Sequence, residues 1–358
     1  MYIRDVEIRP NLVLAPMEGV TDLTFRRLVR QIGGCGMTVT EFIPAFGLVK
    51  DIAWCREAAR FDEGEHPVAI QVYGKDPELL AEGARVAQGL GADVVDLNMG
   101  CPAKKVCAHS GGSALMKEPA LAARIVAAIR AAVTVPFTVK MRSGWDPDHK
   151  NAPEVAWMCQ EEGAEGITIH WRTRADRYGG QRQIDKITQT VQRVSVPVIG
   201  NGDIIDIPSA LAMLTETGCD GVMLGRGAMR NPWSLLQIAQ HLRGEAVTPV
   251  TASERKRALL AFLARFHETF RHERAALGRF KQIAKHFTED LPQGTDFRRA
   301  ILRSQSIDDI IALTDAFFSA WQPEALMPLS RPSGPPEAPA GPPQHAARST
   351  TPSGAVVG

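Results

Sequence analysis

The chain has 358 residues, of which 44% are hydrophobic and 23% are charged, and its formal net charge is +1. A chain of this size buries a large core and exceeds what one small domain needs, so we expect one large domain and a smaller one. The near-zero charge excludes a protein that attracts nucleic acid over its whole surface. A nucleic-acid partner would have to meet a local basic patch.

The cysteines and the N-terminal residues argue against further classes of protein. The six cysteines form no C-x-x-C pair and have no regular spacing, which argues against a disulfide framework and against a zinc site. Met1–Glu7 carries charges where a secretory signal has an apolar core, and no run reaches the roughly 18 apolar residues of a membrane span. The sequence predicts a soluble cytoplasmic protein with reduced thiols, no metal and no membrane partner.

Short β-branched segments alternate with helical ones along most of the chain. The expected strands are Leu12–Ala15, Met37–Glu41, Pro67–Val72, Val94–Leu97, Phe137–Met141, Gly166–His170, Val196–Gly200 and Gly221–Leu224. The expected helices are Asp22–Ile32, Pro77–Leu90, Pro119–Ala132, Pro153–Glu162, Ile184–Val194 and Pro208–Thr217. About eight such repeats predict a parallel (β/α)₈ TIM barrel. A doubly wound open sheet is the alternative, but the first strand lacks its G-x-G-x-x-G turn.

The loop after the fourth strand is the most informative segment of the chain. Residues 98–116 place Cys101 on a turn rich in Gly and Pro, directly after an apolar strand. Loops at the carboxyl ends of barrel strands carry the chemistry, so Cys101 is a candidate catalytic residue. A small buried hydrophobe is the ordinary alternative for a cysteine. Asn98 and the two lysines that follow the cysteine favour a reactive thiol beside a polar, anionic ligand.

Polar residues follow most of the predicted strands and should converge at one mouth. They are Gln71, Asn98, Cys101, Lys140, Arg142, His170, Arg172, Asn201, Asp203 and Arg226. Glycines gather after the seventh and eighth strands, at Gly200–Asp203 and Gly225–Gly227, where TIM barrels commonly bind phosphate. Each loop alone could be a tight turn that needs positive φ. Together they favour a planar, anionic, phosphate-bearing cofactor.

The sequence pattern changes after the predicted barrel, from alternating strands and helices to helices alone. We expect a barrel over residues 1–243, a linker over 244–252 and a helical bundle over 253–322, where apolar residues recur at helical spacing. One side of the bundle is basic, which indicates either a solvated face or an RNA-binding face. Residues 323–358 are rich in Pro, Gly, Ser and Ala, and we expect a disordered tail.

Five segments resemble the tRNA-dihydrouridine synthases, and bacterial B-type enzymes most of all. They are Ala15–Asp22, Asn98–Pro102, Val139–Trp145, Ile169–Arg174 and Gly200–Ile204, within a match from about Leu12 to Trp321. The resemblance implies an FMN-binding barrel with a helical tRNA-binding domain. It also implies reduction of the C5–C6 double bond of uridine in the D-loop of tRNA, with NADPH or NADH as reductant.

The resemblance further implies a role for each site residue. Cys101 would give the proton to C5, Lys140 would stabilise negative charge on the flavin and uracil, and Asn98 would hold the uracil edge. The FMN-binding residues would be Pro16, Met17, Glu18, Gln71, Lys140, His170, Asn201, Gly202, Asp203, Gly225 and Arg226. The tRNA-binding residues would be Asn98, Arg142, Arg172, Arg174, Arg271, Arg274, Lys281, Lys285 and Arg298.

Two other functions remain open at this stage. An FMN-dependent dehydrogenase of a free pyrimidine shares the barrel and the phosphate loops, but has little use for a basic helical domain. A non-catalytic tRNA-binding protein that keeps a flavin fold would not need Cys101 and Lys140. The chain departs from the family pattern at Trp171 and Cys107, and neither change removes a catalytic group. We expect a monomer; the sequence does not identify the uridine that is modified.

Overall fold

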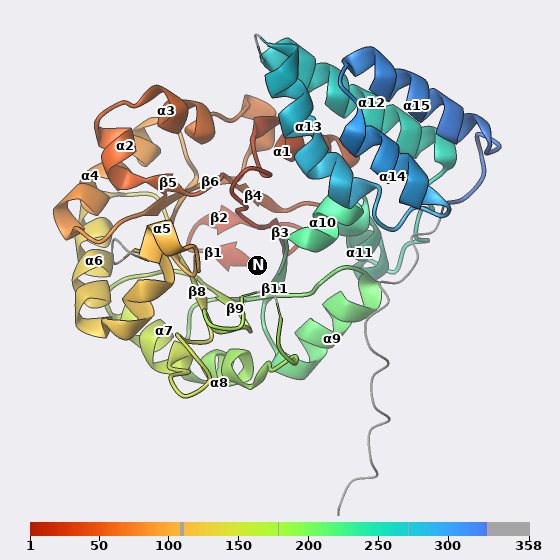
Figure 1. The fold of residues 1–358 in the computed structure, drawn as a ribbon. Helices are drawn as coiled ribbons and strands as arrows, with labels where there is room; N and C mark the ends of the chain where they lie inside the picture. The colour runs from red at the N-terminus through yellow and green to blue at the C-terminus, as the bar shows by residue number, and fades with distance from the viewer. Residues whose placement is uncertain (108–110, 178, 271, 328–358) are drawn as a thin grey trace, which may run out of the picture.

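The computed structural model describes residues 1–107, 111–177, 179–270 and 272–327. Its main sheet has nine strands, and pairing of β4 with β6 closes all but β5 (Ile43–Pro44) into a parallel barrel (Figure 1). The barrel strands are β3 (Leu12–Leu14), β4 (Met37–Val39), β6 (Val68–Tyr73), β7 (Val94–Met99), β8 (Phe137–Arg142), β9 (Ile167–His170), β10 (Val198–Asn201) and β11 (Gly221–Leu224). The predicted TIM barrel is confirmed, and the open sheet is excluded because the strand order closes.

Helices surround the barrel. They are α1 (Leu23–Ile32), α2 (Ala45–Val49), α3 (Ala53–Ala59), α4 (Pro77–Gly89), α6 (Pro119–Ala132), α7 (Ala152–Glu161), α8 (Asp185–Arg193), α9 (Ile207–Thr217), α10 (Arg226–Arg230) and α11 (Ser234–Leu242). Helices α1, α4 and α6 to α9 correspond to the six that the sequence predicts, and the others were not predicted. Short elements interrupt the loops: α5 (Lys104–Cys107) and the 3₁₀ turns η1 (Glu63–Glu65) and η2 (Gly112–Lys117). Several helices begin with a proline in the first turn, where the missing N–H costs no hydrogen bond.

Both faces of most barrel strands are buried, so the strands read as apolar runs rather than alternating ones. The N-terminal hairpin of β1 (Tyr2–Ile3) and β2 (Val6–Glu7) lies at one end of the barrel. There Ile3 and Ile8 pack with Val13 and Val94 in a separate apolar cluster. This end is closed by hydrophobic packing, which leaves the opposite end for polar chemistry.

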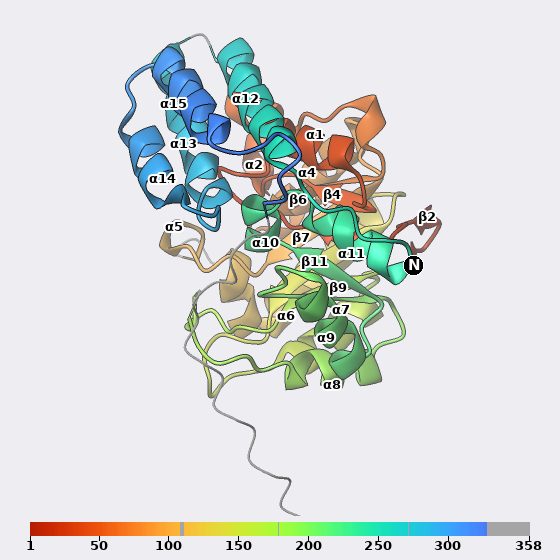
Figure 2. The same cartoon turned by 90° about the vertical axis from the view of Figure 1, so that its right-hand side faces the viewer.

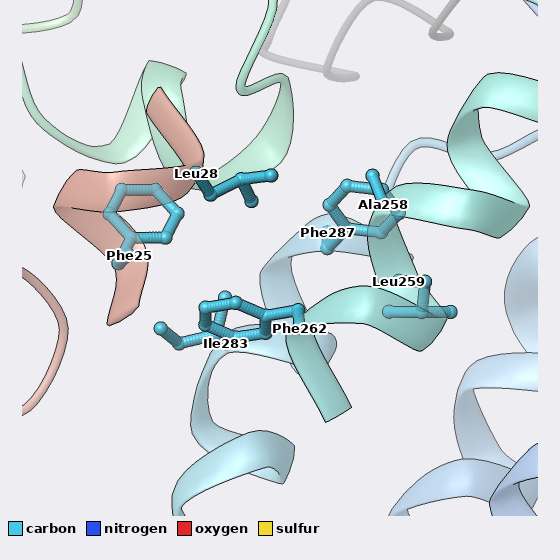
Figure 3. A pocket seen from close by; sticks show the side chains of 7 residues that line it. All are labelled: Phe25, Leu28, Ala258, Leu259, Phe262, Ile283 and Phe287. Carbon is cyan, nitrogen blue, oxygen red and sulfur yellow. The ribbon is translucent and has the colours of Figure 1, made fainter. Parts of the chain in front are cut away.

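The C-terminal helices form a second unit beside the barrel. They are α12 (Ala252–Thr269), α13 (Glu273–Phe287), α14 (Gly294–Arg303) and α15 (Ile307–Ser319) (Figures 1 and 2). Helix α12 packs on α1, where the rings of Phe25 and Phe262 meet edge to face with centroids 6.1 Å apart. A small apolar pocket lies in this seam, lined by side chains of α1, α12 and α13 (Figure 3). Hydrophobic packing therefore joins the two units.

The beginning of the expected tail is structured. The backbone N–H of Ala252 donates to the carbonyl of Ala325 at 2.9 Å, and Met327 is buried. The Nε of the buried Arg255 donates to the Met327 carbonyl at 3.2 Å. Residues 323–327 thus belong to the helical unit, because they supply partners for α12. The rest of the expected tail, 328–358, lies outside the described residues.

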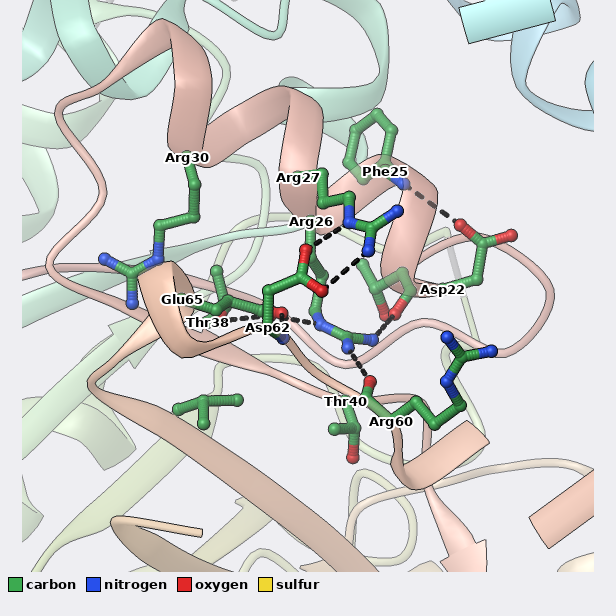
Figure 4. A network of polar contacts seen from close by, with 12 residues as sticks. Asp22, Phe25, Arg26, Arg27, Arg30, Thr38, Thr40, Arg60, Asp62 and Glu65 are labelled. Carbon is green, nitrogen blue, oxygen red and sulfur yellow. Dashed lines mark hydrogen bonds and ion pairs between the residues drawn. The ribbon is translucent and has the colours of Figure 1, made fainter. Parts of the chain in front are cut away.

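A buried ion pair supports the start of α1 (Figure 4). Arg26, which is fully buried, pairs through Nε with Glu65, and Glu65 also accepts from the Thr38 hydroxyl at 2.8 Å. The remaining guanidinium nitrogens of Arg26 donate to the carbonyls of Thr21 and Arg60, at 2.7 and 2.5 Å. Because every partner is polar and close, the charge is compensated, and the loop before α1 is fixed.

Candidate active site

The register of the sheet places the predicted polar residues next to one another at the carboxyl ends of the strands. Asn98 on β7 is level with Lys140 on β8, and His170 on β9 is level with Asn201 on β10. Lys140 and His170 are the only residues of their strands that are not buried. The barrel therefore opens at these two side chains.

Hydrogen bonds between backbone groups and nearby side chains hold the Cys101 loop. Asn98 Oδ1 accepts from the N–H groups of Gly100 and Cys101, at 3.0 and 2.9 Å. The Cys101 carbonyl accepts from the Ser113 hydroxyl at 2.9 Å, and Cys107 Sγ lies 3.4 Å from the same oxygen. The Cys101 thiol is half-buried, and burial is the main cause that raises its pKa above the ordinary value. At neutral pH this thiol is protonated, as a proton donor requires.

Lys140 carries its charge into the mouth of the barrel. Its Nζ donates to Asn201 Oδ1 at 3.1 Å, and Asn201 Nδ2 donates to the Met223 carbonyl at 2.7 Å, which fixes the oxygen toward the lysine. Burial, followed by the charge of Arg142, lowers the Lys140 pKa to about 8. The ammonium form still predominates at pH 7, so Lys140 can meet an anion.

His170 is a neutral imidazole. Burial and then the positive charge of Arg142 lower its pKa well below the ordinary value. Its Nδ1 is 3.1 Å from the Arg172 backbone N–H and accepts from it, so the ring proton is on Nε2. Gly202, at a φ of +118°, passes so close that a Cβ would lie 3.0 Å from His170 Cε1 and 2.5 Å from a Trp171 carbon. A side chain at this position would displace the imidazole.

Asp203 organises the loop after β10 through two arginines. Arg172 holds both of its carboxylate oxygens, at 2.9 and 2.7 Å, and Arg226 donates to Oδ1 at 2.6 Å. Arg172 is also stacked on the Trp171 ring and donates to the Gly179 carbonyl. A carboxylate committed to two guanidinium groups orients them, whereas direct contact between Asp203 and a phosphate would bring two anions together.

Arg142 and Arg172, which the resemblance places among the tRNA contacts, are each only 5% exposed. Arg142 donates to the Gly100 and Thr173 carbonyls, at 2.9 and 2.8 Å, and so joins the Cys101 loop to the loop after β9. Arg174 is half-buried and lies 4.5 Å from the centroid of the Trp145 ring. Arg142 and Arg172 hold loops in place, since their donors bond to loop carbonyls and, for Arg172, to the Asp203 carboxylate.

The loop after β3 faces the loop after β11. A Cβ on Gly225 would lie 3.4 Å from the sulfur of Met17, so the predicted Met17 and Gly225 loops meet at the mouth, next to Pro16. Glu18 pairs with Lys105 of the cysteine loop. The loop is thus tied on one side to the segment that carries Cys101.

Arg279 of α13 holds the other side of this loop. Its Nε donates to Asp22 Oδ2 at 3.2 Å, and its Nη2 lies 3.2 and 3.3 Å from the two oxygens of Glu41. Glu41 in turn accepts from the Gly19 N–H, and Asp22 caps α1 through the Phe25 N–H at 3.0 Å. The sequence predicts no role for Arg279, because a long-range ion pair leaves no pattern along the chain.

The residues expected to contact tRNA from the bundle differ in exposure. Arg274 and Lys285 are exposed on α13, and Arg298 is half-buried on α14. Lys281 is committed to the Ser304 carbonyl. Arg271 lies outside the described residues.

Two further kinds of site are absent from the part of the chain that the structure describes. No helix there is long and apolar enough to cross a membrane. No group of three or more His, Cys, Asp or Glu side chains there could hold a metal ion.

Comparisons with known proteins agree with the fold and the motifs. The family model described as dihydrouridine synthase matches residues 13–321. The chain is 38% identical to tRNA-dihydrouridine synthase B of Xanthomonas axonopodis pv. citri, over 89% of this chain and 96% of that protein. Identity is 38% with the protein of the same name from Pseudomonas aeruginosa (87% and 94% covered) and 35% with that of Escherichia coli K12 (89% and 99% covered).

Among solved structures, morphinone reductase superposes with a TM-score of 0.50 at 14% identity. The match covers 70% of this chain and 90% of that one, which supports the barrel fold. With a family model over most of its length and relatives above 30% identity, the chain belongs to the dihydrouridine synthase family.

Proposed function

We propose that this enzyme reduces the C5–C6 double bond of uridine in the D-loop of tRNA to 5,6-dihydrouridine, with FMN as cofactor and NADPH or NADH as reductant. The observation that carries the proposal is a protonated thiol, Cys101, on a fixed loop beside the Lys140 ammonium, in a chain of the dihydrouridine synthase family. The relatives named tRNA-dihydrouridine synthase B support tRNA as the substrate.

The residues at the mouth fit a flavin. Lys140 and the Nε2–H of His170 are donors at the barrel opening, where the ring carbonyls of a flavin would need them. Gly202 lets the loop after β10 pass close to the His170 ring, because a Cβ there would collide with Trp171 and push the imidazole out of place. Arg226, oriented by Asp203, would hold the phosphate together with the backbone of Gly225. When bound, FMN supplies hydride-transfer chemistry.

Within this site Cys101 would act as the general acid. Its raised pKa keeps the proton on sulfur until C5 of the uracil needs it, and the Asn98 contact fixes where the thiol lies. Lys140 would stabilise negative charge that develops on the ligand, and the charge is effective because the site is largely desolvated. Asn98 would also present its amide to the uracil edge.

A base in folded tRNA must leave its stack to enter the barrel. Recognition of the surrounding RNA would therefore fall to the helical unit, with Arg274, Lys285 and Arg298 as phosphate contacts. Arg279 holds this unit against the loop after β3, so a tRNA docked on α13 would lie beside a loop of the mouth.

The proposal is tested by incubating the purified protein with NADPH and unmodified tRNA, followed by nucleoside analysis. Dihydrouridine should form in tRNA and not from free uridine or uracil, and the protein should carry flavin absorbance. Reduction of the free pyrimidine at a similar rate would instead support a small-pyrimidine dehydrogenase. Binding of tRNA without any dihydrouridine would support a non-catalytic binding protein.

A further inference from the structure

A chain of buried polar groups crosses three strands below the mouth. The Thr138 hydroxyl donates to Asp96 Oδ1 at 2.6 Å, Gln71 Nε2 donates to Asp96 Oδ2 at 2.5 Å, and Asn98 Nδ2 donates to Gln71 Oε1 at 2.8 Å. All four side chains are at most 5% exposed. The register explains the contacts, because Gln71, Asp96 and Thr138 are level on β6, β7 and β8.

The direction of each amide in this chain is fixed from both ends. At the Cys101 end, two backbone N–H groups require the oxygen of Asn98, so its nitrogen must face Gln71. Gln71 then turns its oxygen to Asn98 and its nitrogen to position 96. Only an acceptor satisfies that nitrogen, and an ionised carboxylate accepts at both oxygens.

A buried carboxylate is costly unless donors compensate it. Burial raises the Asp96 pKa to about 6, while the hydrogen bonds from Gln71 and Thr138 and the charge of Lys140 lower it. The group is therefore ionised at neutral pH, as its two donors require. The mouth contacts proposed above do not use Asp96, and the sequence signal for it is one acid between Val95 and Leu97 in an apolar strand.

We propose that Asp96 is a positioning residue, which sets the direction of the Gln71 and Asn98 amides and thereby the conformation of the Cys101 backbone. The proposal rests on the proposed function for its effect on catalysis. It has a second consequence for recognition, because each amide nitrogen uses one of its two hydrogens in the chain. Gln71 is fully buried, so it is the remaining N–H of Asn98, which is 5% exposed, that makes this edge of the site a hydrogen-bond donor. A donor there suits the carbonyl oxygens of a pyrimidine ring.

A double-mutant cycle at positions 71 and 96 tests the proposal. Gln71→Glu places two carboxylates face to face, which breaks the chain. Adding Asp96→Asn restores the chain of hydrogen bonds, with the bond between positions 71 and 96 reversed. The nitrogen of the new amide donates to the new carboxylate, and the oxygen of the amide still accepts from Thr138. Gln88→Glu is the matched control, because Gln88 uses only its oxygen, which accepts from the Thr134 N–H at 2.6 Å.

The first readout is hydrogen exchange of the Gly100 and Cys101 amides, with the amides of α6 as a reference for global stability. Gln71→Glu should raise exchange at Gly100 and Cys101 at least tenfold relative to α6, and the double variant should recover most of it. Gln88→Glu should leave both amides unchanged. Unchanged exchange in Gln71→Glu, or no recovery in the double variant, would overturn the proposal. If Gln71→Glu alone fails to fold, recovery of the fold by Asp96→Asn supports it.

The second readout is tRNA reduction by flavin-loaded protein. Gln71→Glu should lower kcat by about 100-fold or more, and the double variant should regain at least tenfold. A double variant that regains protection at Gly100 and Cys101 but none of the rate would reduce Asp96 to a structural residue. If the unaltered enzyme does not reduce tRNA although the exchange pattern holds, the proposed function fails and the positioning of the loop stands.

Discussion

Arg279 gives the sharpest test of how the helical unit is held on the barrel. Its side chain is 23% exposed, and those of its partners Asp22 and Glu41 are 18% and 14% exposed. At about 3.2 Å and an effective dielectric constant of about 20, each pair attracts by roughly 5 kcal/mol before desolvation. Hydrogen bonds to charged groups contribute about 1.5–3 kcal/mol net, and these are long ones. Arg279→Met should therefore lower the free energy of unfolding by about 2–4 kcal/mol.

The loss of unfolding free energy in Arg279→Met should depend on pH in one direction. Burial raises the Asp22 pKa, and Arg279 is the largest influence that lowers it, so the variant should have a still higher Asp22 pKa. A carboxyl whose pKa is raised by folding costs stability once the pH exceeds the ordinary value, and the cost grows up to the raised pKa. The deficit of Arg279→Met should therefore be smaller at pH 5 than at pH 7.5.

Urea unfolding, followed by tryptophan fluorescence and circular dichroism, measures both quantities. Arg274→Met on the same helix is the control, because Arg274 is exposed and should change the free energy of unfolding by less than about 0.5 kcal/mol. A loss below about 0.5 kcal/mol for Arg279→Met, or a deficit that grows on acidification, would refute the reasoning.

Three further predictions concern the mouth and the RNA surface. The rate of tRNA reduction should fall as the pH rises through about 8, where Lys140 loses its proton, and Lys140→Arg should abolish that limb whatever its overall rate. Arg226→Ala should weaken FMN binding by about 1–3 kcal/mol in a fluorescence titration, whereas Arg182→Ala, which breaks a distant exposed pair with Glu216, should not. Neutralising Arg274 and Lys285 together should reduce the slope of log tRNA affinity against log salt by about two, with flavin content unchanged; an unaltered slope would remove α13 from the RNA-binding surface.

The fold was predictable because the sequence pattern of each segment agrees with the element that the segment forms in the barrel. β6 to β11 appear within about two residues of their expected bounds, since buried parallel strands read as apolar runs between proline- and glycine-marked turns. The residues at the mouth follow from the same logic, because strand ends converge in a barrel whatever the details of the loops.

What the sequence did not predict are contacts between distant segments. Arg142 ends β8 and Arg172 follows β9, and both were expected to contact tRNA, but they are buried against carbonyls and Asp203 of neighbouring loops. Arg279 meets Glu41 across 238 residues, and Asp96 finds its donors on two other strands. No periodicity encodes such pairs, since each depends on how two segments far apart in the chain come together.

The proton donor is the part of the mechanism that a single experiment can settle. Enzyme reduced beforehand with NADPH is mixed with unmodified tRNA, and dihydrouridine is measured over a single turnover for the unaltered protein, Cys101→Ala and Cys107→Ala. We expect all three to bind and reduce the flavin, and Cys101→Ala alone to form dihydrouridine at least about 100-fold more slowly. A Cys101→Ala variant that reduces tRNA at nearly the unaltered rate would contradict the assignment of Cys101 as the acid.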